Sequence, residues 1–182
     1  MITTLIALHT FSKSSSISVT ATLGKKPAAN VVVWLLGAGK PNPGRFVISQ
    51  KNKKFDPRIL VVPTGSTVSF PNRDEVFHNV FAEYNAKKFD LGMYPKGQSR
   101  EVTFDKSGVV SVLCNVHSSM SAFVVVVDSA IYGMTNSKGM LTLEDVPKGS
   151  YDLLAWHESG VKISEPVTVA DAPIKKTLQL KK

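Results

Sequence analysis

Short Val-rich segments separated by glycine and proline constrain the fold of this chain more than any other feature of the sequence. The 12 glycines and 10 prolines fall between these segments, and no long stretch repeats apolar residues at helical spacing. The longest apolar runs, Val31–Leu36 and Phe123–Val127, are far shorter than the roughly 20 residues of a membrane-spanning helix. The sequence therefore predicts a soluble, all-β protein with no membrane span.

The middle of the chain carries the densest series of strand signals. Turn residues such as Pro63-Thr64-Gly65 separate most of the segments. Short strands with regular turn signals are typical of a β-sandwich with Greek-key connections. The stretch Tyr84–Pro95 is expected to be a long connection between two of these strands. The predicted strands are 46–50, 58–62, 66–70, 76–82, 98–104, 109–113 and 122–127.

The first residues of the chain lack the pattern of a complete secretory signal. Met1–Phe11 contains one short apolar patch with no Lys or Arg before it, so it is at best a remnant of such a signal. The serine-rich residues that follow predict a mobile leader over residues 1–16, which contains His9. The first strand is expected at Ile17–Leu23.

The positive charge of the chain lies mostly near its N-terminus. The net charge is +8, and residues 1–45 contain five basic residues and no acidic one. No basic stripe alternates with aromatic residues, and no recognition-helix or RNA-binding motif is present, so the pattern argues against a nucleic-acid partner. Solubility and docking to an acidic partner explain the positive charge equally well.

A single cysteine marks the most informative motif. One thiol excludes an intrachain disulfide and a zinc site built on paired cysteines. Cys114, His117 and Met120 follow one another at three-residue steps just after a predicted strand, and His78 lies 36 residues before the cysteine. Thiolate and thioether sulfur suit Cu(I), whereas imidazole suits both oxidation states of copper. The pattern indicates a copper electron-transfer site.

Two other interpretations of this motif stay open. Cys114 is also compatible with the nucleophile of an enzyme in which His78 or His117 is the base. Such a nucleophile does not require Met120 and usually lies at a helix N-terminus, for which the sequence gives no signal. Cys114 is also compatible with a small buried apolar side chain. We expect that the protein is not an enzyme.

Two segments, Phe70–Val80 and Gly108–Met120, resemble the cupredoxins, or blue copper proteins, of the amicyanin and plastocyanin kind. The resemblance covers about residues 46–128 and departs from common members at Asn115 and at Ser118-Ser119, where many carry proline. It implies a Greek-key sandwich with one type 1 copper that cycles between Cu(II) and Cu(I). The implied ligands are His78, Cys114, His117 and Met120.

The same resemblance implies a biological setting for the copper site. It points to a periplasmic or otherwise extracytoplasmic carrier with a redox protein as partner, such as a cytochrome c or a dehydrogenase. A copper carrier or chaperone with an exchangeable site is the alternative. An adhesion module that binds no metal also stays open. The sequence does not specify an oligomeric state.

Further residues near the motif have expected roles. In cupredoxins the residue after the first histidine ties the two ligand loops together, and Asn79 holds that position here; an ordinary turn residue is the alternative. Met93 and Tyr94 are expected to line the surface around His117. Met93 is a disfavoured alternative to Met120 as the axial ligand, because Met120 already fits the spacing. His157 is expected to be structural, with a second metal site as the alternative.

The residues after Asp128 resemble the carboxypeptidase-regulatory-like, or transthyretin-like, sandwiches. Their signature appears in the turn-and-strand pattern of Thr135–Leu153. The opening strand, Gly-Lys-Pro turn and apolar strand of such domains are missing after Asp128, but Ile17–Leu36 has this pattern. We therefore expect a second small β-sandwich over residues 17–45 and 129–182, split by an inserted copper domain over residues 46–128.

Overall fold

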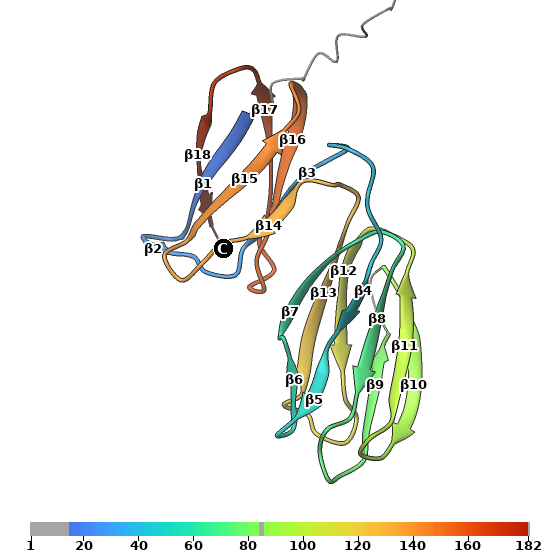
Figure 1. Ribbon diagram of the computed structural model, residues 1–182. Helices are drawn as coiled ribbons and strands as arrows, with labels where there is room; N and C mark the ends of the chain where they lie inside the picture. The colour runs from blue at the N-terminus through green and yellow to red at the C-terminus, as the bar shows by residue number, and fades with distance from the viewer. Residues whose placement is uncertain (1–14, 84–85, 182) are drawn as a thin grey trace, which may run out of the picture.

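A computed structural model describes residues 15–83 and 86–181, and all regular elements within these ranges are strands (Figure 1). The expected all-β fold is thus confirmed. Residues 1–14, with His9 and the expected signal remnant, lie outside the described residues. Within the described ranges, no helix has the length and apolar character that crossing a membrane requires.

Ten strands form what we call the central unit, residues 45–127. Two sheets pack against each other there, one in the order β10-β9-β12-β13-β7 and one in the order β11-β8-β4, and β5 pairs with β6 as a hairpin. The strands are β4 (Arg45–Val47), β5 (Ser49–Lys51), β6 (Lys54–Asp56), β7 (Ile59–Pro63), β8 (Ser66–Pro71), β9 (His78–Ala82), β10 (Phe89–Tyr94), β11 (Ser99–Phe104), β12 (Gly108–Leu113) and β13 (Ser121–Val127).

Alternation of buried and partly exposed residues explains this packing. Along β8, Ser66, Val68 and Phe70 are buried and the residues between them are only partly buried. Successive side chains of a strand point to opposite faces of the sheet, so one face of β8 enters the core. The inward-facing residues of both sheets, including Val80, form one apolar cluster. This core supports the ends of β9 and β12.

The expected connection over Tyr84–Pro95 is wrong for its second half. Phe89–Tyr94 forms β10, which pairs antiparallel with β9 and places Met93 opposite Asn79 and Tyr94 opposite His78. The register of this pair shifts between Asp90 and Met93. The irregularity interrupts the two-residue alternation by which a strand is found in a sequence. Residues 84 and 85 lie outside the described residues.

Eight strands form what we call the flanking unit. One sheet has the order β15-β1-β18, with β2 paired to β1, and the other has the order β14-β3-β16-β17. The strands are β1 (Ser15–Leu23), β2 (Lys26–Pro27), β3 (Val32–Leu35), β14 (Tyr132–Met134), β15 (Met140–Val146), β16 (Gly149–Trp156), β17 (Lys162–Val169) and β18 (Ile174–Leu180). Residues that precede and follow the central unit thus share both sheets.

The first strand begins earlier than expected. Ser15 belongs to β1, is buried, and donates a hydrogen bond from Oγ to the carbonyl of Ala172 at 2.8 Å. The mobile leader expected over residues 1–16 is therefore wrong for its last two residues. β1 continues with Ile17, Val19 and Ala21 in the core, and it runs parallel to β18 with Ile17 opposite Ile174.

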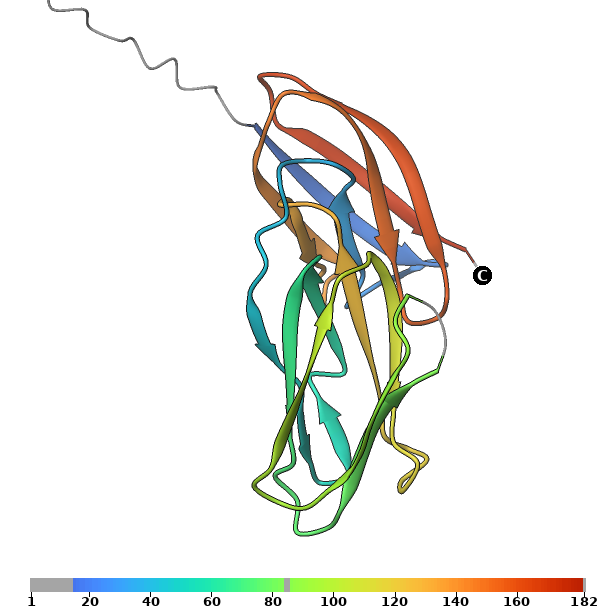
Figure 2. The ribbon, with the colours of Figure 1, turned by 90° about the vertical axis from the view of Figure 1, so that its right-hand side faces the viewer.

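The two units meet at a third apolar cluster. It contains Val32 and Trp156 of the flanking unit and Ile59, Val125 and Val127 of the central unit. The two chain connections lie side by side, because the N–H of Ala130 donates to the carbonyl of Ala38 at 2.9 Å. Figure 2 shows the flanking unit beyond one end of the central unit, with the loops of the central unit at its opposite end.

Candidate metal centre

Three possible metal ligands converge at the end of the central unit far from the flanking unit. The ligand atoms of His78, Cys114 and His117 all lie within 4.8 Å of one another. His78 begins β9, and Cys114 directly follows β12, which is hydrogen-bonded to β9 with Leu113 opposite Phe81. Neighbouring strands therefore bring the histidine and the cysteine together, and the loop after β12 adds His117.

The two imidazoles present the same nitrogen to each other. Nδ1 of His78 lies 3.2 Å from Nδ1 of His117, and the ring centroids are 4.9 Å apart at an interplanar angle of 65°. Cys114 is 5% exposed and His78 is fully buried, whereas His117 is partly exposed. Two of the three possible ligands are thus buried, and the imidazole of His117 is partly accessible from outside.

Met120 closes the loop that carries these residues. Its backbone N–H donates to the carbonyl of His117 at 2.9 Å, so the chain turns back after the histidine. Its side chain is 1% exposed and belongs to the same apolar cluster as Cys114. Its thioether therefore lies inside the protein, in the same apolar core as the thiol of Cys114.

Asp74 orients His78, a role that no pattern in the sequence predicted. Nε2 of His78 lies 2.8 Å from Oδ2 of Asp74. An ionised carboxylate only accepts, so Nε2 is the donor in this hydrogen bond, and Nδ1 is the ring nitrogen that remains to face a metal. The four-residue spacing from His78 was the only available signal for Asp74, and acidic residues on loops are common.

Backbone groups of the β5–β6 turn hold Asp74 in place. The N–H groups of Asn52 and Lys53 donate to its two carboxylate oxygens at 2.6 and 2.8 Å. Both residues have positive φ, as in a two-residue hairpin turn of type I′. Burial tends to raise the pKa of Asp74, but hydrogen bonds from Lys53, His78 and Asn52 together keep the pKa below its usual value.

Asn79 joins the two loops that supply the ligands. Its Oδ1 accepts the backbone N–H of Asn115 at 2.6 Å, and its Nδ2 lies 3.4 Å from Oδ1 of Asp90. The expected tie between the loops is therefore present in the structure. Because Asn115 follows the cysteine directly, this hydrogen bond fixes the backbone beside Cys114.

The charge state of His117 suits metal binding. Partial desolvation lowers the pKa of the ring, and the nearby His78 ring and Lys53 ammonium lower the pKa further, whereas Asp74 opposes them. A lowered pKa favours the neutral imidazole, and only the neutral ring can bind a metal. The protein environment therefore prepares His117 as a ligand.

Two expectations about residues around His117 have different outcomes. Tyr94 is fully buried, donates its hydroxyl to the carbonyl of Phe70 at 2.8 Å and accepts a hydrogen bond from Gln50, so its expected place on the surface is wrong. Burial raises the pKa of Tyr94 to about 12. Met93 is 56% exposed, whereas Met120 is buried, so Met93 is a poor substitute for Met120 as a sulfur ligand.

His157 has a local partner in the turn after β16. Its Nδ1 accepts the backbone N–H of Ser159 at 3.2 Å and lies 2.9 Å from the hydroxyl of the same residue. Among the described residues, the one group of three or more His, Cys, Asp or Glu suited to a metal is that of His78, Cys114 and His117. The turn geometry supports the structural role of His157.

Comparison with known proteins identifies the class of the central unit. Residues 45–127 match the family described as copper binding proteins of the plastocyanin/azurin family. This segment is therefore a cupredoxin domain. Copper is the metal that such a domain binds, and the group of His78, Cys114 and His117 is positioned to hold it. The match does not extend to the flanking unit.

Solved structures similar to this chain include copper proteins. A reduced tryptophan-to-tyrosine mutant of amicyanin is 27% identical, with a TM-score of 0.43, and covers 50% of this chain and 90% of its own. A purple cupredoxin from Nitrosopumilus maritimus is 27% identical, with a TM-score of 0.40 and coverages of 46% and 98%. A copper-containing nitrite reductase from Thermus scotoductus SA-01 is 22% identical, with a TM-score of 0.44 and coverages of 59% and 28%. A comparison with curated proteins finds no match.

Proposed function

We propose that the protein is a type 1 copper carrier of single electrons, with His78, Cys114, His117 and Met120 as ligands. The observation that carries this proposal is the convergence of two imidazoles and the single thiol within 4.8 Å inside a copper-binding domain. Bound copper supplies a one-electron Cu(II)/Cu(I) couple. The residues of the chain supply the geometry and the dry surroundings.

The hydrogen bonds around the ligands favour an electron carrier. Asp74 holds His78, and Asn79 holds the backbone next to Cys114. Ligands fixed by their neighbours change position little when the charge of the site changes, because they are already oriented. Rigid ligands therefore suit electron transfer. A copper carrier or chaperone must release its metal and needs a more open site. The burial of Cys114 also disfavours a cysteine nucleophile.

The surface around His117 fits a protein partner. Val76 and Phe77 precede His78, Val116 precedes His117, and Met93 lies opposite Asn79 on the neighbouring strand; all four side chains are at least 40% exposed. Exposed apolar side chains grouped at one site are typical of a surface that contacts another protein. We call these four residues the apolar rim and infer that a redox protein docks on it next to His117.

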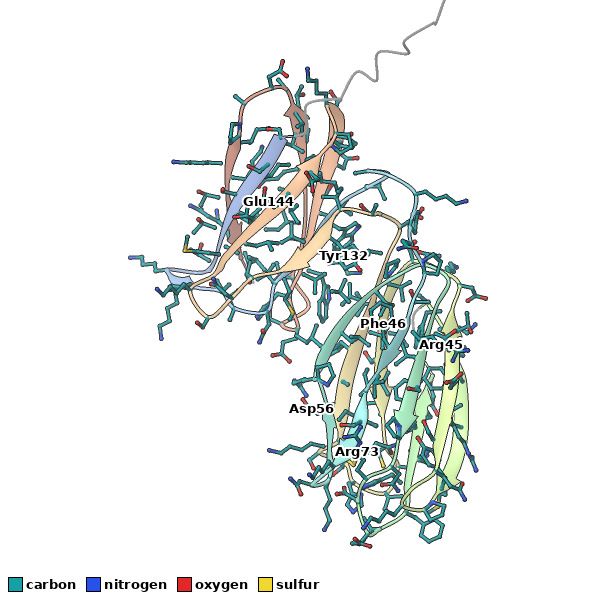
Figure 3. All side chains as sticks on the ribbon, in the orientation of Figure 1. Arg45, Phe46, Asp56, Arg73, Tyr132 and Glu144 are labelled. Carbon is teal, nitrogen blue, oxygen red and sulfur yellow. The ribbon has the colours of Figure 1, made fainter. Side chains whose placement is uncertain are left out.

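Basic residues lie beside the apolar rim on one side. The β5–β6 hairpin and the loop after β8 carry cations, and Figure 3 shows Arg73 at this end of the central unit. Within the described ranges these cations form no ion pair with a carboxylate. The arrangement favours an acidic redox partner, such as an acidic cytochrome c or dehydrogenase, in an extracytoplasmic compartment. The residues are Lys51, Lys53, Lys54 and Arg73.

Addition of Cu(II) to the metal-free protein tests the proposal directly. We expect one equivalent to bind and to give an intense blue or green colour, because a thiolate bound to Cu(II) absorbs visible light strongly. Visible absorption spectra recorded during a titration measure both the intensity and the stoichiometry. A colourless complex, or absorption that keeps rising well beyond one equivalent, would contradict a type 1 site.

Electron transfer to an acidic partner should slow as salt is added. Between about 0.01 and 0.5 M salt the screening length falls from about 30 Å to less than 8 Å, so electrostatic steering weakens. Stopped-flow mixing of the reduced protein with an acidic redox protein measures the rate. Replacing Lys53 and Lys54 with glutamine should flatten the dependence. Replacing Lys25 and Lys26 of the flanking unit should leave it unchanged; if it does not, the charge that steers the partner lies elsewhere.

We also infer that the flanking unit is a carboxypeptidase-regulatory-like sandwich. Its two sheets enclose one apolar cluster, and segments from both sides of the central unit contribute to that cluster, among them Ile17 and Leu153. The Gly-Lys-Pro opening at residues 24–27 and the turn-and-strand pattern of Thr135–Leu153 support this inference.

A further inference from the structure

One arginine of the central unit connects the flanking unit to the residues that follow Met120. Arg58 lies just before β7, and its Nη1 donates to Ser121 twice, to the carbonyl oxygen at 3.1 Å and to the hydroxyl at 2.8 Å. The carbonyl of Arg58 accepts the N–H of Phe123 at 2.8 Å, and its guanidinium lies 5.6 Å from the centre of the Phe123 ring. Arg58 thus holds two of the first three residues of β13.

The residues that Arg58 holds directly follow the loop that carries Cys114, His117 and Met120. Ser121 directly follows Met120, whose N–H is bonded to the carbonyl of His117. Met120 is therefore fixed on one side by the turn from His117 and on the other side by the residues that Arg58 holds. A displacement of Ser121 would be transmitted to Met120 by the single peptide bond between them.

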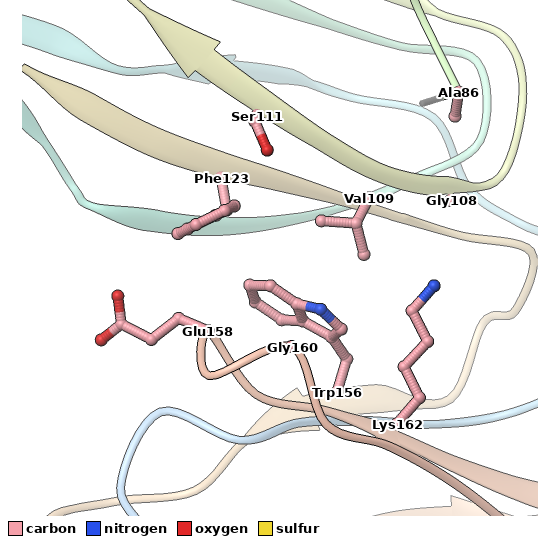
Figure 4. Close-up of a pocket in the computed structure, with 9 residues that line it drawn as sticks. All are labelled: Ala86, Gly108, Val109, Ser111, Phe123, Trp156, Glu158, Gly160 and Lys162. Carbon is pink, nitrogen blue, oxygen red and sulfur yellow. The ribbon is translucent and has the colours of Figure 1, made fainter. Parts of the chain in front are cut away.

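Two residues of the flanking unit contact Arg58 and Phe123. Oε2 of Glu158 accepts from Nε of Arg58 at 2.7 Å, and the Trp156 ring meets the Phe123 ring at a centroid distance of 5.1 Å and an angle of 61°. Figure 4 shows Trp156 and Glu158 facing Phe123 across the space between the units, where a cavity of about 380 Å³ lies. The cavity adjoins the apolar cluster at which the two units meet, so these contacts lie at the edge of that interface.

We propose that the flanking unit positions the Met120 side of the metal centre, with Glu158 acting on Ser121 through Arg58. The inference rests on the proposed copper function, because Met120 matters as a ligand only if copper binds there. Glu158 is a positioning residue in this scheme. With its carboxylate bonded to Nε, the guanidinium keeps the orientation in which Nη1 reaches Ser121.

Amide hydrogen exchange of the metal-free protein tests whether Glu158 holds the backbone next to Met120 in place. In Glu158→Gln, the amides of Met120 and Phe123 should exchange about two- to fivefold faster, the size of effect expected from one partly exposed ion pair. Glu165→Gln is the matched control, because Glu165 pairs with Lys176 inside the flanking unit at 4.0 Å. That variant should leave both amides unchanged. Equal exchange in the wild type and Glu158→Gln would overturn the proposal.

The copper-loaded protein provides an independent readout. Glu158→Gln should shift the reduction potential of the bound copper, because the potential depends on the axial ligand. The Met120→Leu protein and the Met120→Leu/Glu158→Gln protein should have the same reduction potential, because the effect of Glu158 would act through Met120. A shift that persists there would show that Glu158 acts by a route other than Met120, and would overturn the proposal. If the wild type takes up no copper, the proposed function fails, whereas the exchange experiment still decides whether Glu158 holds the loop.

Discussion

Cys114→Ser should lose all of the intense visible absorption that Cu(II) gives to the wild type. Cys114 is the only thiol in the chain, and a neutral hydroxyl is a poor substitute for a soft thiolate ligand. Sulfur-to-copper charge transfer therefore has no other possible donor. Visible spectra of the two proteins at equal copper loading, with bound copper quantified separately, measure the loss.

The variant should still fold, so the loss of colour can be assigned to the metal centre. A hydroxyl in place of the buried thiol costs about 1–3 kcal/mol of unfolding free energy if it lacks a partner. Thermal unfolding of the metal-free proteins checks this cost. His157→Ala is the matched control and should retain full absorption, because His157 bonds within its own turn. Absorption that survives in Cys114→Ser would show that another group binds the copper.

A fragment of residues 129–182 should fail to fold alone. β1 lies between β15 and β18 in one sheet, and β3 lies between β14 and β16 in the other. Without these strands the β16–β17 hairpin is the main remaining pairing, and an isolated hairpin is marginally stable at best. Thermal unfolding followed by circular dichroism should show no cooperative transition.

Two further fragments test the reason for this failure. Residues 45–128 contain all the strands of the central unit and the four proposed ligands, so this fragment should unfold cooperatively and bind copper. Residues 15–37 joined to residues 129–181 by a short Gly/Ser linker should recover cooperative unfolding, because the missing strands are restored. If residues 129–182 already unfold cooperatively, the two units are sequential domains and the expected insertion is wrong.

Local patterns in the sequence were sufficient to predict most strands of the central unit. β8, β12 and β13 lie within one residue of their predicted ranges, because each alternates apolar residues or forms a compact apolar run. β10 was missed because its pairing is irregular between Asp90 and Met93. The start of β1 was missed because its first two residues are serines, whose burial depends on contacts with residues far away in the chain.

The candidate site could be predicted only as far as its motif extends. His78, Cys114 and His117 were found from residue type and spacing, and the structure brings them together. Asp74 and Arg58 were not found as part of the site. Their roles depend on partners brought close by the fold, such as the β5–β6 turn for Asp74 and Glu158 for Arg58, which is 100 residues away.

The interleaved order of the two units also favours an order of folding in which the central unit forms first. β1 and β3 are synthesised first, but their partners follow much later in the chain. Ala28, between these two strands, accepts a hydrogen bond from Thr135, which lies 107 residues further along the sequence. Closing so long a flexible loop is costly and slows pairing between distant strands. Once the central unit has folded, the two chain segments that join it to the flanking unit lie side by side. The distance that the flanking strands must then close corresponds to a loop of only a few residues. Substitutions that delay folding of the central unit should therefore leave β1 and β3 unpaired and prone to aggregation for longer, although they change no residue of the flanking unit.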